Sequence, residues 1–307
     1  MNKKPFIFLI SVLLGLSFIG CESQPPTTLR LATYTYSTND RIDNLQPLAE
    51  HLEAELARPI SVHSYEDVAS FLEGIKANEV DIGLINTLGY LLLSLDNTVM
   101  TPVANLKVQE DSKDNYKTVL LTNKMSLDNS NIAETLDSLN MLLVAPGSTS
   151  GNLVPRLYLS SMGIKSPEIQ FKSLRYGGDH TITLQKLVEG ETDLCAIGSN
   201  EYYKQLKKDS SLSTKTKVLW ISEEIPLGPV LVSNSLSSSQ KEQITKVFLS
   251  LHTNHSVALN GIKAGWSEAK QAEKFHAISD SYYDQFRNLN GNSTDLGKIL
   301  NQFMTTQ

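Results

Sequence analysis

Pro146-Gly-Ser-Thr-Ser-Gly-Asn-Leu-Val-Pro-Arg156 joins two apolar runs, residues 141–145 and 153–162. The first run predicts a buried strand and the second a short helix. A helix start leaves backbone N–H groups unpaired and carries a positive partial charge, so a strand, a turn and a helix in this order predict a cradle for an oxyanion. Ordinary N-capping of the helix is the alternative role of the turn. The turn adds three adjacent, uncharged donors, the hydroxyls of Ser148, Thr149 and Ser150.

The N-terminal segment predicts export. Lys3 and Lys4 precede an apolar run over residues 5–19 that ends at Gly20-Cys21, which is typical of a secretory signal peptide over residues 1–20. The small residue before the cysteine resembles the lipobox of bacterial lipoproteins. That resemblance implies cleavage before Cys21, a diacylglycerol on its thiol, and a protein anchored by lipid to the periplasmic or extracytoplasmic face of a membrane. Residues 21–28 would then be a lipidated, polar tether; an uncleaved anchor would leave the domain on the same side.

Charge and cysteine content exclude several classes of function. Without Lys3 and Lys4 the chain has 25 basic against 33 acidic residues, a net charge near −8. This charge argues against nucleic-acid binding, and if the ligand is an anion, local dipoles must hold it. With Cys21 lipidated, Cys195 stands alone in an apolar run, so we expect a buried, unreactive thiol and neither a disulfide nor a CxxC metal site. No metal and no cofactor are expected.

Strands and helices alternate along the chain. Alternation of this kind predicts an α/β protein with mostly parallel sheets flanked by helices. About 280 residues are enough for two compact lobes. Apolar runs predict strands near residues 29–34, 60–63, 80–85, 119–122, 141–145, 169–171, 194–197, 217–221 and 230–233. Helical periodicity predicts helices near residues 45–56, 68–77, 87–95, 132–139, 153–162, 181–188 and 241–253, with mostly helical structure beyond.

Two further turns repeat the pattern of a strand followed by a polar helix start. Tyr176-Gly-Gly-Asp-His180 places His180 near a helix start, where glycine lets backbone N–H groups approach a ligand closely. Capping by Asp179, with His180 in solvent, is the alternative. In the third turn a strand ends at Asn86-Thr87, at the kind of edge where open α/β sheets bind ligands. Tyr90 follows, as a phenolic donor or as part of the core.

Together these segments resemble, in order and spacing, the substrate-binding proteins of phosphate, phosphite and phosphonate ABC transporters, the PhnD-like group of type II periplasmic binding proteins. The resemblance covers about residues 30–290. Its most specific parts are Ser148-Thr-Ser-Gly151 and the Gly178-Asp-His180 that follows. The remaining matches are weak singly: Leu45-Gln-Pro-Leu48, Glu79-Val-Asp-Ile-Gly83, Leu153-Val-Pro155, Gly190-Glu-Thr-Asp193, Ile225-Pro226 with Pro229, and Gly265-Trp266 with Tyr283-Asp-Gln-Phe-Arg287.

The resemblance implies two lobes, each a mostly parallel sheet flanked by helices, joined by two hinge crossings and closing on a ligand. Lobe one would comprise residues 29–122 and 220–307, and lobe two residues 123–219. The protein would be a monomeric solute-binding component of an ABC transporter, with a permease and an ATPase as partners.

The resemblance also implies which side chains hold the ligand. In that family the Ser-Thr-Ser hydroxyls and amides hold the phosphoryl oxygens, the histidine adds a donor, and tyrosines contribute from the first lobe. We expect the histidine to aid binding most when protonated, so affinity would weaken as pH rises past neutrality. The expected ligand-binding residues are Ser148, Thr149, Ser150, His180, Tyr90, Asn86, Thr87, Tyr34 and Tyr36.

Two positions depart from the family members that bind aminoalkylphosphonates. Those members place acidic residues against the ligand amine, whereas this chain has Asn200 and Gly228 at these positions. Neither residue pairs with an ammonium group, although Glu201 adjoins the first position. We therefore expect a small phosphorus oxyanion (phosphate, phosphite or phosphonate) or another ligand without an amine, and poor binding of 2-aminoethylphosphonate.

Two other functions fit parts of the sequence. Ser150 and His180, with Asp179 or Asp193, suggest a hydrolytic triad. However, Gly147-Ser-Thr-Ser-Gly151 has threonine where a Gly-X-Ser-X-Gly elbow has its nucleophile, so we do not expect an enzyme. A lipoprotein that senses the same ligand and signals to a membrane kinase or receptor would share the fold, because transport and sensing both use cleft closure.

Overall fold

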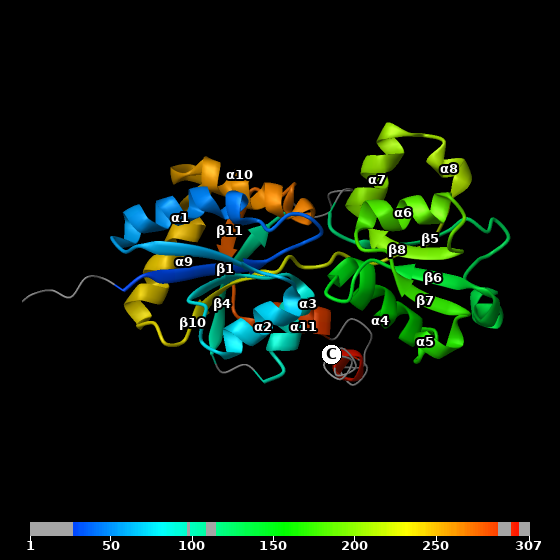
Figure 1. Ribbon diagram of the computed structural model, residues 1–307, viewed down its shortest axis with the longest axis horizontal. Helices are drawn as coiled ribbons and strands as arrows, with labels where there is room; N and C mark the ends of the chain where they lie inside the picture. Colours follow the sequence, from blue (N-terminus) through cyan, green and yellow to red (C-terminus); the bar gives the residue numbers. More distant parts are fainter. Residues whose placement is uncertain (1–26, 97–98, 109–114, 288–295, 301–307) are drawn as a thin grey trace, which may run out of the picture.

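The computed structural model describes residues 27–96, 99–108, 115–287 and 296–300. These residues form two lobes that lie side by side, each built on one β-sheet (Figure 1). This arrangement confirms the two-lobed α/β architecture. The predicted signal peptide over residues 1–20 and the lipidation site Cys21 lie outside the described residues.

Lobe one is built on a six-stranded sheet of β1 (Leu29–Tyr34), β2 (Ile60–Tyr65), β3 (Ile82–Leu84), β4 (Met100–Lys107), β10 (Pro229–Ser233) and β11 (Lys274–Ala277), in the order β11-β4-β10-β3-β1-β2. β1 runs parallel to β2 and β3, whereas β10 runs antiparallel to β3 and β4. One face carries α1 (Ile42–Leu56), α9 (Ser238–Asn254) and α10 (Ser256–Gly265), and the other α2 (Val68–Lys76) and α3 (Thr87–Leu93) (Figure 1). Shorter elements are η4 (Ser267–Ala269), η5 (Asp280–Tyr283) and α11 (Asp284–Arg287).

Lobe two is built on a five-stranded sheet of β5 (Thr118–Thr122), β6 (Asn140–Leu143), β7 (Ser173–Tyr176), β8 (Leu194–Gly198) and β9 (Lys217–Ile221), in the order β7-β6-β8-β5-β9. β6 runs parallel to β7 and β8, whereas β5 runs antiparallel to β8 and β9. The lobe also contains η1 (Ile132–Glu134), η2 (Leu136–Ser138), the π-helix η3 (Thr149–Leu153), α4 (Val154–Ser161), α5 (Pro167–Gln170), α6 (His180–Val188), α7 (Ser199–Lys208) and α8 (Leu212–Lys215). α6 and α7 lie on one side of this sheet, and α4 and α5 on the other (Figure 1).

The lobe boundaries differ from those expected. The chain passes from the first sheet to the second between β4 and β5 and returns between β9 and β10. Residues 118–122 therefore belong to lobe two, where β5 lies between β8 and β9, and lobe two extends to Ile221 rather than to residue 219. Both sheets are mixed rather than mostly parallel, because β5 and β10, the strands that follow the crossings, run against their neighbours. Apolar patterning locates a strand but does not say which sheet it joins.

One predicted strand is a helix, and some elements were not predicted. Residues 169–171 belong largely to α5, which starts at Pro167 because proline fits the first turn of a helix, and the strand follows only at Ser173. β4, β11 and α7 were not predicted; Pro102 interrupts the strand pattern of β4, which lies beside the edge strand β11. The expected helix over residues 132–139 is a pair of 3₁₀ turns.

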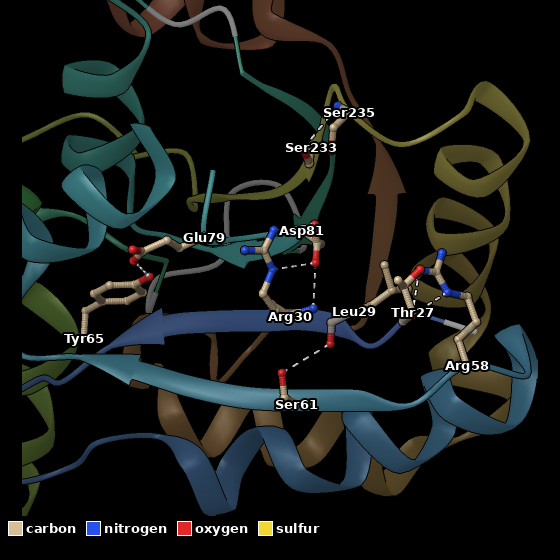
Figure 2. A network of polar contacts seen from close by, with 10 residues as sticks. All are labelled: Thr27, Leu29, Arg30, Arg58, Ser61, Tyr65, Glu79, Asp81, Ser233 and Ser235. Carbon is tan, nitrogen blue, oxygen red and sulfur yellow. Dashed lines mark hydrogen bonds and ion pairs between the residues drawn. The ribbon is translucent and has the colours of Figure 1, made fainter. Parts of the chain in front are cut away.

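Polar contacts fix the N-terminal strand in lobe one (Figure 2). Asp81 accepts hydrogen bonds from the backbone N and the Nε of Arg30 at 2.9 Å each and from its Nη2 at 3.0 Å, which ties β1 to the start of β3. The carbonyl oxygen of Thr27 accepts bonds from Nε and Nη2 of Arg58 at 3.0 and 2.7 Å. The folded domain therefore holds the chain from residue 27 onward, within the segment expected to be a free tether.

Candidate ligand-binding site

The segment that follows β6 forms one wall of the cleft between the lobes. The chain turns at Gly147 and enters the π-helix η3, which continues as α4. Ser148 caps η3, because its Oγ accepts the Gly151 N–H at 3.0 Å. A Cβ at residue 151 would lie 2.3 Å from Cγ2 of Val144, so this turn requires glycine. π-Helical turns are rare and are frequent at functional sites.

Ser150 offers an unpartnered donor in this segment. Its side chain is fully buried, and its Oγ makes no hydrogen bond with any described residue. The backbone around it is fixed, since the Ser150 N–H donates to Tyr116 Oη at 3.2 Å and its carbonyl accepts from Thr118 Oγ1 at 2.8 Å. A Cβ built on Gly198 would lie 3.3 Å from Ser150 Oγ and 3.6 Å from Cε1 of His180, so the two side chains meet beside Gly198. Buried hydroxyls normally have a hydrogen-bond partner, which makes Ser150 a candidate ligand contact.

His180 is a neutral donor in this structure. It is the first residue of α6, whose N-cap Asp179 accepts the Ile182 N–H at 2.8 Å. The Nδ1 of His180 accepts the Gly198 N–H at 3.0 Å. Since a ring nitrogen that accepts carries no proton, the proton of the neutral ring lies on Nε2. Burial lowers the pKa of His180 to about 4, so the ring stays neutral near pH 7.

This tautomer weighs against one expectation and against the hydrolytic alternative. Binding that depends on protonated His180 does not fit a ring whose Nδ1 is occupied and whose pKa lies far below neutrality. A neutral ring with its proton on Nε2 is also unsuited to act as the base for Ser150. Neither suggested acid faces His180 Nδ1, because Asp179 caps α6 and Asp193 binds Asn140 and Lys124.

Tyr36 faces His180 from lobe one. Their ring centroids are 6.1 Å apart, and Tyr36 Oη is buried with no partner among the described residues. The loop that carries Tyr36 is strained, since Ser37 and Arg41 adopt positive φ angles of 55° and 64°. Arg41 is buried behind this loop, with its guanidinium 4.7 Å from the Tyr34 ring, 5.6 Å from the Tyr36 ring and 4.2 Å from the Trp266 ring. Sequence analysis did not identify this support.

Three of the expected ligand contacts are used to hold the lobes in place. The Nδ2 of Asn86 donates across the cleft to the Gly147 carbonyl at 2.8 Å, and the Leu88 N–H donates to Thr149 Oγ1 at 3.0 Å. Thr87 Oγ1 donates to the Pro226 carbonyl in the returning crossing at 2.5 Å. The two lobes are therefore already in contact on this side of the cleft.

The predicted tyrosines divide between cleft and core. Tyr34 is 3% exposed, packs against Phe71 and lines the cleft with its neighbour Tyr36. Tyr90 lies in the core of lobe one, where its ring contacts Tyr283 and its hydroxyl donates to Asp280. Because that hydroxyl is engaged inside lobe one, the structure does not bring Tyr90 to the ligand.

The acidic groups near the cleft are arranged differently from the expectation. A Cβ at Gly228 would lie 1.8 Å from the Ile85 carbonyl oxygen, so no side chain fits there. Glu201 is nearly buried and is occupied by Thr181, Lys204 and Gln205. Sequence analysis missed Glu268. Burial raises the pKa of its carboxyl group, and the positive charge of Arg41 opposes this rise. Burial, followed by the charge of Glu268, raises the pKa of Tyr36 and Tyr116, so both phenols remain protonated.

Neutral donors dominate the resulting site. A hydroxyl that accepts one hydrogen bond keeps its own proton, so Ser148 and Thr149 still donate. Cys195 is buried and free, and burial raises the pKa of its thiol, as expected for an unreactive cysteine. No group of three or more potential metal ligands occurs within residues 27–96, 99–108, 115–287 and 296–300. The donors at the site are the hydroxyls of Ser148, Thr149 and Ser150, the Nε2–H of His180, and the phenols of Tyr36 and Tyr116.

Comparison with known proteins identifies the family. The model of the periplasmic substrate-binding proteins of phosphonate ABC transporters matches residues 32–283. The chain belongs to this family. Like its other members, the chain is the periplasmic substrate-binding component of an ABC transporter, and its relatives are transport proteins rather than enzymes.

Relatives with known names bind different phosphorus oxyanions. The chain is 24% identical to the phosphonates-binding periplasmic protein of Escherichia coli K12, over 82% of this chain and 74% of that one. It is 23% identical to the phosphate-import protein PhnD of Mycolicibacterium smegmatis, over 69% of this chain and 68% of that one. The structure of PhnD1 from Prochlorococcus marinus in complex with methylphosphonate is similar in fold, with a TM-score of 0.67 and 18% identity, over 89% of this chain and 98% of that one.

Within the described part of the chain, no helix is both long and apolar enough to cross a membrane.

Proposed function

We propose that this protein captures a small phosphorus oxyanion between its lobes and delivers it to the permease and ATPase of an ABC transporter. The observation that carries the proposal is the set of neutral donors around Ser150 and His180, which suits a phosphoryl group because each N–H or O–H points positive charge at the ligand oxygens. Phosphonate, phosphate and phosphite share this chemistry, and named relatives bind members of the same set.

The number of donors is sufficient for tight binding. A hydrogen bond to a charged group contributes roughly 1.5–3 kcal/mol. Micromolar affinity corresponds to about 8 kcal/mol, and the protein must also offset the cost of ordering the ligand and the lobes. Four or five such bonds meet this requirement without a lysine or arginine at the ligand.

A ligand panel tests this proposal. The purified protein is melted with phosphate, phosphite, methylphosphonate, ethylphosphonate or sulfate at a hundred times the expected dissociation constant. A true ligand adds roughly 2.7 kcal/mol of stability and raises the melting temperature by a few degrees. We expect a phosphorus oxyanion to give this shift and sulfate to give a smaller one.

The variant Gly198→Val locates the binding. Its side chain would displace the side chain of Asn200, whose Oδ1 lies 2.6 Å from a built Cβ, and would enter the space beside Ser150 and His180 while leaving every proposed donor in the chain. We therefore expect the ligand-dependent shift to disappear. Gly198→Ala gives a graded control, and the melting temperature without ligand shows whether each variant folds. A shift that survives in folded Gly198→Val would place the ligand elsewhere.

The proposal includes a lipid anchor at Cys21. It rests on Lys3, Lys4 and the apolar run before Gly20-Cys21, and on a folded domain whose first strand starts at Leu29. We expect the protein to incorporate radiolabelled palmitate in a bacterial host and to sediment with membranes. The variant Cys21→Ala should lose both properties. If mild hydrolysis released the label, and if the Cys21→Ala variant were still labelled, the result would contradict a lipid anchor at Cys21.

A further inference from the structure

The loop between β1 and α1 has few contacts of its own to hold it in one conformation. Residues 37–40 are polar and exposed, and backbone hydrogen bonds of 2.9 and 3.0 Å join Tyr36 to Asn39. The Tyr36 hydroxyl is nevertheless buried without a partner among the described residues, and its ring centroid lies 6.1 Å from that of His180 in lobe two. A donor on a polar, exposed loop needs a separate support, because ordering the loop on binding would cost conformational entropy.

Arg41 supplies that support. Its side chain is buried in lobe one. Its Nε donates to the Gly265 carbonyl at the end of α10 at 2.9 Å, and its Nη1 donates to the Tyr34 carbonyl at the end of β1 at 3.2 Å. The backbone N–H of Arg41 also donates to Asn39 Oδ1 at 2.8 Å. One residue therefore ties both ends of the loop to the body of lobe one.

The same guanidinium lies against aromatic rings. It is 4.7 Å from the ring of Tyr34, 5.6 Å from that of Tyr36 and 4.2 Å from that of Trp266. A planar guanidinium donates in its plane while its faces lie against rings, a combination that neither a lysine nor an apolar side chain provides. The Arg41 side chain thus fixes the loop through two carbonyls and contacts the Tyr36 ring directly.

We propose that Arg41 is a positioning residue for ligand capture: its planar guanidinium holds the ring of Tyr36 where the Tyr36 hydroxyl donates to a phosphoryl group bound beside His180. Arg41 itself does not touch the ligand. The inference rests on the proposed function and adds how lobe one presents its donor. The alternative is a purely structural role, in which Arg41 stabilises lobe one without acting on Tyr36.

A double-mutant cycle between Arg41 and Tyr36 distinguishes the two roles. Calorimetric titration with methylphosphonate, phosphate and phosphite gives the affinities of the parent, Tyr36→Phe, Arg41→Met and the double variant. Tyr36→Phe removes one hydrogen bond to a charged group, so affinity should fall about tenfold. Arg41→Met should cause a similar loss. The double variant should bind within about twofold of Tyr36→Phe alone, because both changes remove the same contact.

Two controls separate positioning from general damage to lobe one. The loss for Arg41→Met should multiply with that for Ser150→Ala, because Ser150 acts from η3 in the opposite lobe. Arg58→Met is the matched control at the other end of β1, where Arg58 binds the Thr27 carbonyl (Figure 2). This variant should leave affinity within about twofold of the parent.

Arg41→Lys keeps the test valid if Arg41→Met does not fold. Lysine retains the cation but lacks the planar fork that reaches two carbonyls. Folded Arg41→Lys should therefore also lose affinity, and this loss should disappear in the Tyr36→Phe background. The melting temperature without ligand shows whether each variant is folded.

Each contrary outcome overturns a defined statement. Losses for Arg41→Met and Tyr36→Phe that multiply in the double variant would establish the structural role and refute the inference, as would parental affinity in folded Arg41→Lys. Parental affinity in Tyr36→Phe would remove Tyr36 from the site, refuting the inference and leaving the proposed function standing. A parent protein that binds none of the three phosphorus oxyanions would refute the proposed function as well.

Discussion

Two helix starts face each other across the cleft and use the same kind of side chain for different purposes. In lobe one, α3 begins after β3 with Asn86 as its cap, and in lobe two, η3 begins after β6 with Ser148 as its cap. The side-chain amide of Asn86 donates a hydrogen bond to the Gly147 carbonyl of the opposite lobe. The η3 start keeps Ser150 Oγ buried and unpartnered.

The difference shows that polar residues at a helix start do not specify a ligand contact by themselves. What distinguishes the two starts is whether the donor already has a protein partner. Thr149 lies between these cases, because its oxygen accepts the Leu88 N–H from the other lobe and its proton remains available. The two starts therefore predict different effects of mutation, one on ligand contact and one on closure.

The largest effect is expected for Ser150→Ala. It removes one charge-assisted hydrogen bond, so affinity for the bound phosphorus oxyanion should fall about 10-fold to 100-fold by titration calorimetry. The melting temperature without ligand should stay the same or rise, because the variant removes a buried hydroxyl that lacks a partner. Ser161→Ala, on the exposed side of α4, is the matched control and should be neutral. Affinity within twofold of the parent would remove η3 from the site.

A smaller loss is expected for Asn86→Asp. The carboxylate still caps α3 by accepting the Gly89 N–H, but it lacks the N–H that donates to Gly147. Affinity should therefore fall about twofold to tenfold through weaker closure, with little change in melting temperature. Small-angle scattering without ligand should show a more open molecule. A loss as large as that of Ser150→Ala would mean that Asn86 contacts the ligand, which would erase the contrast between the two helix starts.

His180 provides a test by pH. Because its folded pKa is about 4, the ring of the folded protein is neutral throughout the range from pH 6.5 to 8. The ratio of affinities between the parent and His180→Gln should therefore be constant from pH 6.5 to 8, with ligand ionisation cancelling in the ratio. A ratio that grows as pH falls through this range would restore the protonated histidine as the binding form.

The same residue should make folding sensitive to acid. Between pH 6.5 and 4 the unfolded state binds a proton that folded His180 does not, so stability falls as pH falls through this window. Urea unfolding at pH 7 and pH 4.5 should show a larger loss for the parent than for His180→Gln. Equal losses would show that burial does not keep this ring neutral.

The smallest effect is expected for the acidic residues. Gly228 leaves no room for a carboxylate, and the Glu201 carboxylate is already engaged by Lys204. We therefore expect 2-aminoethylphosphonate to bind no more tightly than ethylphosphonate, and Glu201→Gln and Glu268→Gln to leave this ratio within about threefold. Tight binding of the amine that is lost on Glu268→Gln would show that Glu268 takes the role of the missing acids.

Local features of the site were predictable from sequence, whereas contacts between the lobes were not. The strand, turn and hydroxyls around Ser150 follow from apolar runs and glycine placement, and they lie where expected. The roles of Asn86 and Thr149 depend on how closely the two lobes approach, which no local pattern records. Glu268 was missed because it lies within the short 3₁₀ turn η4 after Trp266, where no motif marks it as a buried acid.

The fold shows the same division between local and distant information. β1 and β9 have the predicted bounds, because apolar side chains make up most of each strand. Residues 118–122 were placed in the wrong lobe, since the choice of sheet depends on pairing with β8, more than seventy residues away.

Gly228 restricts how the specificity of this protein could change during evolution. A Cβ there would lie 1.8 Å from the Ile85 carbonyl oxygen and 2.6 Å from the Asn86 Cα, so any replacement must also displace the segment that joins β3 to α3. A lineage acquiring an amine-bearing ligand through this position would pass through poorly folded intermediates. Selection would more easily act through Asn200, where a carboxylate replaces an amide of the same size.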